Sequence, residues 1–304
     1  MSRLDGLLPH LGAFIGSCLV GAAVVATRTA VKEIDPIGLA FLRYSQGALV
    51  LFAWLVLFTG TPIRVRSSEF RAFAELGLLM FALFPVLFNT ALRFTTASRG
   101  AVILATMPLW GAFLARKYTG EQLRTMQVAG VLLSFTGIVV VFAESGLGVG
   151  GSGRIAAGNL LMLLTALVGG VYAVRAKPVM SRYSPMQVTA YAMLAGALVL
   201  FVPALAEGLP GQLRHASRDT LLLVLYLGTL GGAIAFWMFA YTLARLSPTQ
   251  ALVYINMNPV VATIFASVFL DEPLTTAFGI GFIMVIAGLL LTNLPQRTAK
   301  LANV

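Results

Sequence analysis

The sequence Gly47-Ala-Leu-Val-Leu-Phe52 occurs twice in the chain, the second time as Gly196-Ala-Leu-Val-Leu-Phe201, 149 residues later. Further residues repeat at this offset or at 151 residues: Gly21 with Gly170, Pro36 with Pro185, Pro108 with Pro259, Glu121 with Glu272, Leu123 with Leu274, Gly130 with Gly281 and Gly137 with Gly288. Matches at consistent offsets through most of both halves predict an internal repeat.

Both copies lie within long apolar runs, and most of the chain consists of such runs. Of its 304 residues, 59% are hydrophobic and 11% are charged, whereas soluble domains carry roughly a quarter charged residues. A helix needs roughly 20 mostly apolar residues to cross the hydrocarbon of a bilayer. The runs are continuous rather than alternating, which favours helices over barrel strands. The composition therefore predicts an all-α integral membrane protein.

Ten segments are long and apolar enough to be predicted as transmembrane helices. They are Leu7–Thr27, Ile37–Phe58, Phe70–Thr90, Ala97–Ala115, Thr125–Ala143, Ile155–Val174, Met186–Ala206, Leu221–Leu243, Thr249–Leu270 and Thr276–Leu294. We predict two five-helix repeats, over residues 1–146 and 147–304. Because five is an odd number, the second repeat must be inverted relative to the first. The glycines of the fifth and tenth segments permit close helix contact, so we assign these two helices to the scaffold.

Charges in the loops support the inversion independently. Arg116, Lys117 and Arg124 surround the loop after the fourth segment, whereas the equivalent loop of the second half carries Asp271 and Glu272. The loops after the third segment of each half do not fit this pattern. Lys and Arg are more numerous on the side that holds both termini, a bias typical of cytoplasmic loops. We therefore expect a multi-pass protein of the bacterial inner membrane with both termini in the cytoplasm.

The net charge of +10 does not indicate a nucleic-acid partner. Its basic residues are scattered between apolar runs instead of gathering on one face of a soluble domain. The single cysteine, Cys18, excludes an intramolecular disulfide. No clear cleavage site follows the first apolar segment, so we expect it to be the first span rather than a signal peptide.

Two sets of motif residues occur, one in each half, but the Pro-x-x-Leu-Ala-Phe-x-Arg pattern is intact only in the first half, since Ala192 replaces the arginine in the second. The first is Asp35-Pro-Ile-Gly-Leu-Ala-Phe-Leu-Arg43, Pro108, Gly120-Glu-Gln-Leu123 and Gly130, and the second is Pro259, Asp271-Glu-Pro-Leu274 and Gly281. In these residues the chain resembles the drug/metabolite transporter superfamily, in its ten-helix group of two EamA-type repeats. The resemblance covers nearly the whole chain and implies export of amino acids or related metabolites from the cytoplasm. Among such exporters we favour the aromatic-amino-acid type.

Pro108 and Pro259 fall near the middle of the equivalent fourth and ninth segments. Proline removes a backbone hydrogen bond and displaces the carbonyl four residues earlier, which predicts free acceptors at Leu104 and Ile255. Polar side chains gather beside the prolines: Thr106, Asn256 and Asn258. We predict that these broken helices line the transport path. The alternative is that both prolines kink helices for packing alone.

Aromatic side chains with polar atoms occur in the fourth, sixth, eighth and ninth segments: Trp110, Tyr172, Trp237, Tyr241 and Tyr254. An aromatic or amphipathic ligand would stack on their rings and bond to their hydroxyl and indole groups. The alternative is an interfacial belt, which fits Tyr172 and Tyr241 at least as well. Ser17 and Asn89 complete the predicted substrate site, with hydrogen bonding between helices as the alternative.

Two charged residues inside the predicted spans bear on mechanism. Arg43 could pair with a substrate carboxylate, but we favour the interpretation that its side chain snorkels to the headgroups. Glu75 is the only acidic residue within the predicted spans. Proton coupling usually needs a carboxylate deep in the membrane, whereas Glu75 lies near the inner end of the third span. We therefore expect a facilitator or a weakly proton-linked exporter rather than a strongly proton-driven pump, with coupling through Glu75 as the alternative.

The sequence lacks the motifs that functions other than transport would require. A membrane-embedded enzyme would need a catalytic motif, and neither His-Glu-x-x-His nor a Walker-type loop is present. A nucleotide-sugar, sugar-phosphate or drug carrier of the same fold is the main alternative within transport. We expect no catalytic residue, metal or cofactor. The predicted partners are a small-molecule substrate and the lipid bilayer, with no nucleic acid, and we expect a monomer rather than an obligate dimer.

Overall fold

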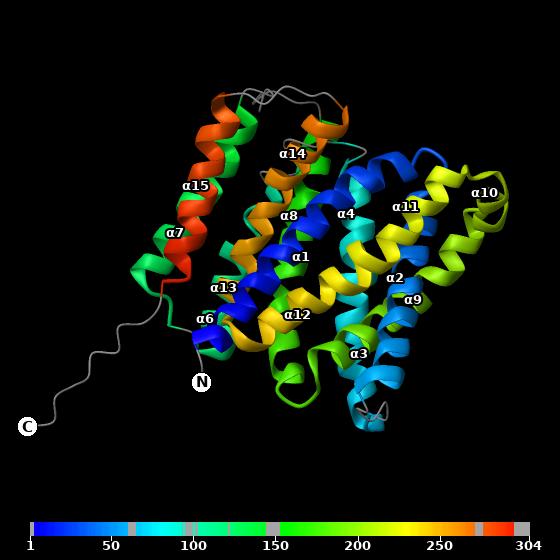
Figure 1. Cartoon of the computed structure of the whole chain (residues 1–304), viewed down its shortest axis with the longest axis horizontal. Helices are drawn as coiled ribbons and strands as arrows, with labels where there is room; N and C mark the ends of the chain where they lie inside the picture. Colours follow the sequence, from blue (N-terminus) through cyan, green and yellow to red (C-terminus); the bar gives the residue numbers. More distant parts are fainter. Residues whose placement is uncertain are drawn as a thin grey trace, which may run out of the picture.

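The structure is a computed structural model that describes residues 3–59, 65–92, 94, 100, 103–120, 122–143, 153–270 and 276–294. Within these ranges every regular element is helical, as the composition predicts, and the helices form one bundle (Figure 1). Several motif residues lie outside the described part: Glu121, Asp271, Glu272, Pro273 and Leu274. The start of the predicted fourth span, apart from Gly100, also lies outside it.

The helical elements follow one another closely along the chain. They are α1 (Arg3–Ala30), α2 (Pro36–Trp54), η1 (Leu55–Thr59), η2 (Ser67–Glu69), α3 (Phe70–Gly77), η3 (Leu78–Leu83), α4 (Phe84–Leu92), α6 (Met107–Thr119), α7 (Thr125–Ala143), α8 (Gly153–Met180), α9 (Pro185–Ala206), α10 (Leu209–His215), α11 (Arg218–Gly228), η4 (Thr229–Ile234), α12 (Ala235–Arg245), α13 (Pro248–Leu252), η5 (Val253–Asn256), α14 (Met257–Leu270) and α15 (Thr276–Thr292). Of the η segments, η1, η3 and η4 are π-helical, whereas η2 and η5 are 3-10 turns.

Six helical runs in the described residues are long and apolar enough to cross a membrane. They are Gly6–Thr27, Pro36–Thr59, Ser67–Ala91, Gly153–Met180, Pro185–Ala206 and Arg218–Arg245. Two further apolar helices, Thr125–Val140 and Thr276–Thr292, are shorter. The six long runs correspond to the first, second, third, sixth, seventh and eighth predicted spans. A multi-pass helical membrane protein is therefore confirmed, and the count of ten spans stays a prediction.

The third and eighth predicted spans each widen into a π-helix at the same place. η3 and η4 are separated by 151 residues, the offset that relates Pro108 to Pro259. Pro85 follows η3, and a proline ring clashes with the carbonyl four residues earlier, here Phe81 inside η3. A wider turn relieves this clash, and in η4 the pair Gly231-Gly232 allows the same geometry. π segments of this kind are frequent at functional sites.

Helices α7 and α15 lie side by side at one edge of the bundle and meet through glycines (Figure 1). A Cβ atom added to Gly137 would lie 2.7 Å from the carbonyl oxygen of Gly281, and one added to Gly130 would lie 2.6 Å from that of Gly288. Pairing 130 with 288 and 137 with 281 means that the two helices run antiparallel. The glycines permit the close contact that their spacing predicts.

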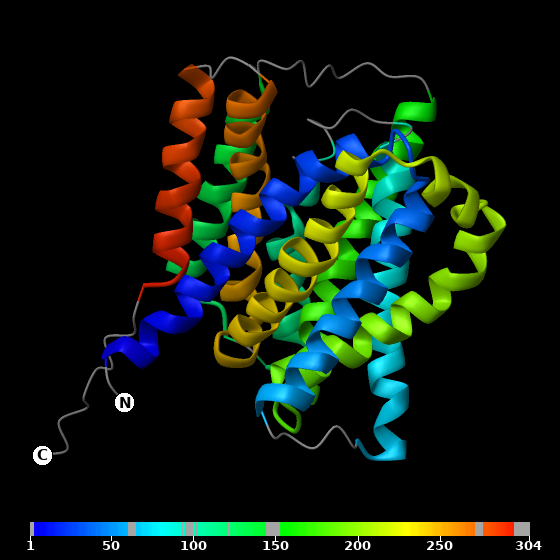
Figure 2. The same ribbon diagram turned by 45° about the vertical axis from the view of Figure 1, so that its right-hand side comes forward.

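Equivalent glycines in the two halves make equivalent contacts between long helices. A Cβ atom added to Gly21 of α1 would lie 2.7 Å from the Cβ of Val261 in α14. One added to Gly170 of α8 would lie 3.2 Å from the Cβ of Trp110 in α6. Val261 and Trp110 are 151 residues apart, so the crossing of α1 with α14 is repeated by that of α8 with α6. Figure 2 shows the first of these crossings, with α1 (blue) passing in front of α14 (orange).

Candidate functional site

The fourth and ninth predicted spans are interrupted just before their prolines. α6 begins at Met107, after a turn at Ala105 and Thr106, and Pro108 is its second residue. In the ninth span the 3-10 turn η5 precedes α14, whose third residue is Pro259. Proline is well tolerated in the first turn of a helix because its missing N–H has no partner there. The prolines therefore sit at the start of new helical segments rather than in the middle of continuous ones.

A polar network surrounds η5 and joins three helices. The Oγ of Ser17 in α1 donates to the backbone carbonyl of Tyr254 at 2.9 Å, and the Tyr254 hydroxyl lies 2.8 Å from Nδ1 of His10. The Nδ2 of Asn256 donates to the Oγ of Ser134 in α7 at 3.0 Å. Three predicted site residues thus hold α1, η5 and α7 together. The Ile255 carbonyl is not free as predicted, because the N–H of Met257 points to it and to the Tyr254 carbonyl.

Several polar side-chain atoms near the helix breaks are buried without a hydrogen-bond partner in the described part of the chain. They include Oδ1 of Asn256, Oδ1 of Asn258 and Nε1 of Trp110. Thr106, by contrast, donates from Oγ1 to the carbonyl of Ile103 at 2.6 Å. A buried polar atom without a partner is costly, so these atoms mark places where a polar ligand or water would bind.

Four rings from both halves of the chain meet in the interior, and we call them the central aromatic cluster: Tyr44 of α2, Phe81 of η3, Tyr172 of α8 and Phe236 of α12. Ring centroids lie 5.1 Å apart for Tyr44 and Phe81, 5.1 Å for Phe81 and Phe236, and 6.3 Å for Phe81 and Tyr172, all edge to face. Such pairs are favourable because ring edges and faces carry opposite partial charge. Tyr172 is only 1% exposed, so it does not belong to a lipid-facing belt.

Sequence reasoning selected Tyr172 but missed the other three members of the cluster. Phe81 and Phe236 lie within or directly after the π segments, and Tyr44 follows the motif arginine. Two of these three residues are marked only by their place at the repeat-equivalent π segments. A π-helix has no clear sequence pattern, so this signal could not be used. The cluster could therefore be found only from the structure.

The remaining predicted aromatic residues lie around this core. Trp110 and Trp237 are half-buried and pack against the same hydrophobic core as the central aromatic cluster. The Tyr241 ring lies 6.4 Å from that of Trp237, and the Arg245 guanidinium stacks on it at 3.5 Å. Trp237 and Tyr241 therefore form a chain of rings along α12, from the core to the end of the helix.

A small pocket of about 80 Å³ lies between the start of α2 and the end of α4. It is lined by Pro36, Ile37, Ala40, Val86, Asn89, Thr90 and Glu207. Ala40 precedes Tyr44 by one helical turn on α2, so the pocket and the cluster are neighbours along this helix. The structure thus places Asn89, a predicted site residue, in a pocket that no member of the central aromatic cluster lines.

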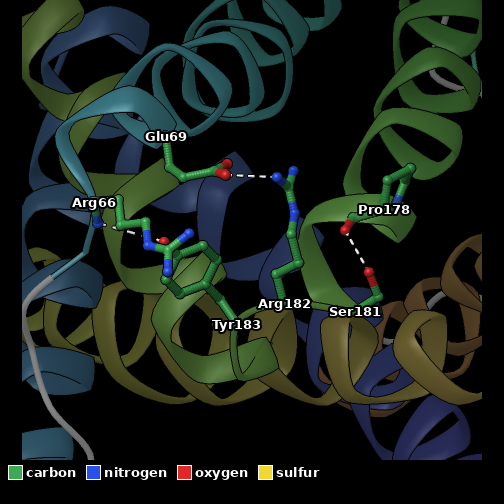
Figure 3. Close-up of polar contacts among 6 residues, drawn as sticks. All are labelled: Arg66, Glu69, Pro178, Ser181, Arg182 and Tyr183. Carbon is green, nitrogen blue, oxygen red and sulfur yellow. Dashed lines mark hydrogen bonds and ion pairs between the residues drawn. The ribbon is translucent and has the colours of Figure 1, made fainter.

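Polar contacts close one end of the bundle, which we call the Arg182 end (Figure 3). Nη1 of Arg182 lies 2.5 Å from Oε1 of Glu69, and the N–H of Arg66 donates to the Tyr183 hydroxyl at 3.4 Å. Arg175 and Glu75 form a second, more exposed ion pair at 3.0 Å. These contacts join the loop between α8 and α9 to the start of the third predicted span, and so join the two halves.

Hydrogen bonds also close the opposite end of the bundle, which we call the Glu33 end. They are made by a loop that is equivalent in the repeat to the loop of Arg182. The Glu33 carboxylate accepts from the backbone N–H of Ser217 at 2.6 Å and from its Oγ at 2.8 Å. These hydrogen bonds, the backbone one first, lower the pKa of Glu33. Glu33 and Arg182 are 149 residues apart, so the two closures occupy the same position in the two repeats.

Arg43 points between helices rather than toward the headgroups, so the snorkelling interpretation is wrong. Its Nη2 donates to the carbonyl of Gly231 in η4 at 2.6 Å. Its guanidinium carbon lies 5.7 Å from the ring centres of both Tyr44 and Phe236. The cation is therefore placed at the edge of the central aromatic cluster.

Comparison with known proteins identifies relatives over nearly the whole chain. The profile described as the EamA-like transporter family matches residues 7–143 and 156–294. An "Uncharacterized transporter" of Archaeoglobus fulgidus is 28% identical over 292 residues, which cover 95% of this chain and 98% of that protein. A "Probable terminal-alkyne amino-acid exporter" of Streptantibioticus cattleyicolor is 29% identical over 265 residues, 86% of each chain. A solved structure with 20% sequence identity superposes with a TM-score of 0.77 and covers 96% of this chain and 97% of its own, which shows the same fold.

Proposed function

Because this chain belongs to the EamA-like transporter family, we propose that it exports amino acids or related small metabolites from the cytoplasm by alternating access. The observation that carries the proposal is the central aromatic cluster. Tyr44 and Phe81 come from the first half, Tyr172 and Phe236 from the second. A ligand between these rings would touch both halves, which is what a carrier needs in order to couple binding to movement.

The proposed architecture is two inverted repeats of five helices, giving ten spans. The antiparallel contact of α7 with α15 supports it, since these are the fifth helices of the two repeats. So does the equivalence of the two closures at Glu33 and Arg182. An inverted pair has two related ends that open in turn while the site between them stays in place.

The proposed substrate path runs through the predicted site residues. We assign Asn89 to the pocket, and Trp110, Tyr172 and Trp237 to the walls around the ligand. We further assign Thr106, Asn256 and Asn258, at the helix breaks, to polar recognition. Two further residues, Ser17 and Tyr254, position η5. Tyr241 lies at the end of the chain of rings along α12. The name of the Streptantibioticus cattleyicolor relative supports an amino-acid-like substrate, and the aromatic core supports an aromatic one.

The proposed sidedness follows from the loop charges. We place both termini and the Arg182 end in the cytoplasm of a bacterial cell, and the Glu33 end outside its inner membrane. The carboxylate of Glu75 pairs with Arg175 and both side chains are substantially exposed, at 41% and 64%. This supports a facilitator or a weakly proton-linked exporter. We also propose a monomer that works without a cofactor.

Counterflow in proteoliposomes tests the proposal. Vesicles preloaded with one unlabelled compound of a panel of amino acids and nucleotide sugars receive the labelled form, with and without a pH gradient. We expect exchange of aromatic amino acids, with little dependence on the gradient. Exchange of nucleotide sugars alone would reject the amino-acid exporter and favour the sugar-nucleotide alternative.

A further inference from the structure

Arg43 is a cation in a membrane-crossing helix, and its charge is incompletely compensated. It lies in the run Pro36–Thr59, where a charged side chain is costly and usually functional. Nη2 bonds to the Gly231 carbonyl, and two ring faces lie within cation–π distance. The Nε atom is buried without an acceptor, and no carboxylate of the described residues lies within ion-pair distance of Arg43. The guanidinium therefore keeps donors for an anion.

Gln46, one helical turn further along α2, offers the complementary group. Its Oε1 is buried and accepts no hydrogen bond within the part of the chain that the structure describes. Both side chains face the same stretch of the eighth predicted span, Arg43 at Gly231 and Gln46 at Gly228. Residues three apart on a helix are neighbours on one face, with Cβ atoms roughly 5–6 Å apart. One face of α2 thus presents an unused donor beside an unused acceptor.

The equivalent contact in the second repeat, between α9 and α3, shows which side chains the packing of the two helices requires. There Ala192 and Ala195 replace Arg43 and Gln46, whereas Gly196 matches Gly47. A Cβ atom on Gly77 would meet the carbonyl of Ala192 and the Cβ of Ala195, just as one on Gly228 would meet Gln46. The same crossing is therefore built from two alanines in one half. The arginine and the glutamine are not required by the packing, and this leaves a binding role for them.

We propose that Arg43 and Gln46 bind the two charged groups of a zwitterionic α-amino acid, an inference that rests on the proposed function. The guanidinium pairs with the carboxylate, for which its planar donors are suited. The amide oxygen of Gln46 accepts from the ammonium group. The substrate side chain then lies against Tyr44, Phe81 and Phe236 of the central aromatic cluster. Because the second repeat lacks the polar pair, the substrate binds in one orientation.

Two alanine variants test the assignment with a built-in control for folding. Arg43→Ala and Gln46→Ala install the residues that the second repeat already carries at this crossing, so both variants should fold. Arg116→Ala is the control, since it also removes one guanidinium, but from an exposed side chain in the last turn of α6. The probes are labelled L-phenylalanine, phenethylamine, which lacks the carboxylate, and 3-phenylpropionate, which lacks the ammonium. Binding is followed by tryptophan fluorescence in detergent and exchange by counterflow in proteoliposomes.

In the wild-type protein L-phenylalanine should bind at least about 10-fold more tightly than either analogue, as expected for hydrogen bonds to charged groups. Arg43→Ala should weaken L-phenylalanine binding about 10- to 100-fold and remove the preference over phenethylamine. Gln46→Ala should remove only the preference over 3-phenylpropionate. Arg116→Ala should keep both preferences.

The outcomes separate this inference from the proposed function. If L-phenylalanine is exchanged but Arg43→Ala keeps the wild-type preference for it over phenethylamine, the inference is overturned and the exporter stands. If Arg43→Ala weakens L-phenylalanine and phenethylamine equally, Arg43 acts on the structure of the site and the inference is again overturned. If the preferences change as expected but no amino acid is exchanged, the subsite stands and the exporter fails. A wild-type protein that neither binds nor exchanges L-phenylalanine overturns both.

Discussion

At the scale of single residues, the polar atoms divide into those that hold helices together and those that lack a partner. Ser17 and Tyr254 make hydrogen bonds between helices, which sequence reasoning had stated as the alternative for Ser17. Trp110, Asn256 and Asn258 each keep a buried atom without a partner in the described residues. Residue type and depth could be predicted from the sequence. Which atom finds a partner depends on the rotation of each helix, and apolar segments with little amphipathic pattern do not reveal that rotation.

Trp237→Ala tests whether the rings beside the core contribute to substrate binding. Loss of one aromatic contact, worth about 0.5–1.5 kcal/mol, should reduce exchange of L-phenylalanine about 2- to 10-fold at subsaturating concentration. Membrane abundance should stay unchanged. Trp54→Ala is the control, because Trp54 is 49% exposed on the outer surface of α2 and should leave exchange unaltered. Equal exchange by wild-type protein and Trp237→Ala would assign Trp237 to packing.

The hydrogen bonds of Glu33 make the stability of the folded protein depend on pH. Hydrogen bonds from Ser217 lower the pKa of this carboxylate in the folded protein. A lowered pKa stabilises the fold above the ordinary pKa of the group, and the effect disappears as the pH falls through the folded value. Glu33→Gln should therefore lower the thermal midpoint at pH 7, and this effect should shrink as the pH falls from 7 to values below the ordinary pKa of the group. Lys32→Gln serves as the control, and an effect of Glu33→Gln that is constant over this range would contradict the assignment.

At the scale of helices, glycine and proline positions determine the contacts and the interruptions. The glycines of α7 and α15 predicted close packing, and the structure confirms it. The prolines predicted two broken helices, and both breaks are present, although each proline begins a new segment rather than kinking an old one. The π segments η3 and η4 escaped prediction, because Pro85 follows the first and a glycine pair lies in the second, so the two halves share no residue pattern there.

Gly137→Val tests the contact between α7 and α15. The added side chain would meet the carbonyl of Gly281, and overpacking of this kind costs about 1–3 kcal/mol. The thermal midpoint of the purified protein should fall. Gly279→Ala on α15 is the control, because an added Cβ there would meet nothing within 4 Å. A midpoint unchanged by Gly137→Val would mean that the two helices do not pack as described.

At the scale of the whole molecule, the repeat in the sequence is matched by a repeat in the contacts. The crossings of α1 with α14 and of α8 with α6 use equivalent glycines, and the closures at Glu33 and Arg182 use equivalent loops. The offset of about 149 to 151 residues was readable from the sequence because glycine and proline tolerate few replacements where backbones approach. The asymmetry between Arg43 and Ala192 was readable too, but its meaning required the position of Gly231.

The ion pair at the Arg182 end should bias which end of the carrier opens. Arg182→Glu places two carboxylates together and should slow exchange up to about fivefold, since an exposed pair is worth about 0–1 kcal/mol. The double variant Glu69→Arg with Arg182→Glu should recover most of the rate. Initial counterflow rates of the wild type, Glu69→Arg, Arg182→Glu and the double variant form a double-mutant cycle. Effects that simply add in the double variant would show that the pair is not coupled.

The central claim is that the two repeats lie antiparallel in the membrane, and Lys32 and Ser181 test it most directly. They are 149 residues apart, occupy equivalent loops and are both exposed. With Cys18 replaced by serine, Lys32→Cys and Ser181→Cys are each labelled with a membrane-impermeant maleimide in spheroplasts and in inverted vesicles. We predict that Lys32→Cys reacts only from outside the cell and Ser181→Cys only from the cytoplasmic side. Labelling of both from the same side would contradict the inverted arrangement and the transport path that depends on it.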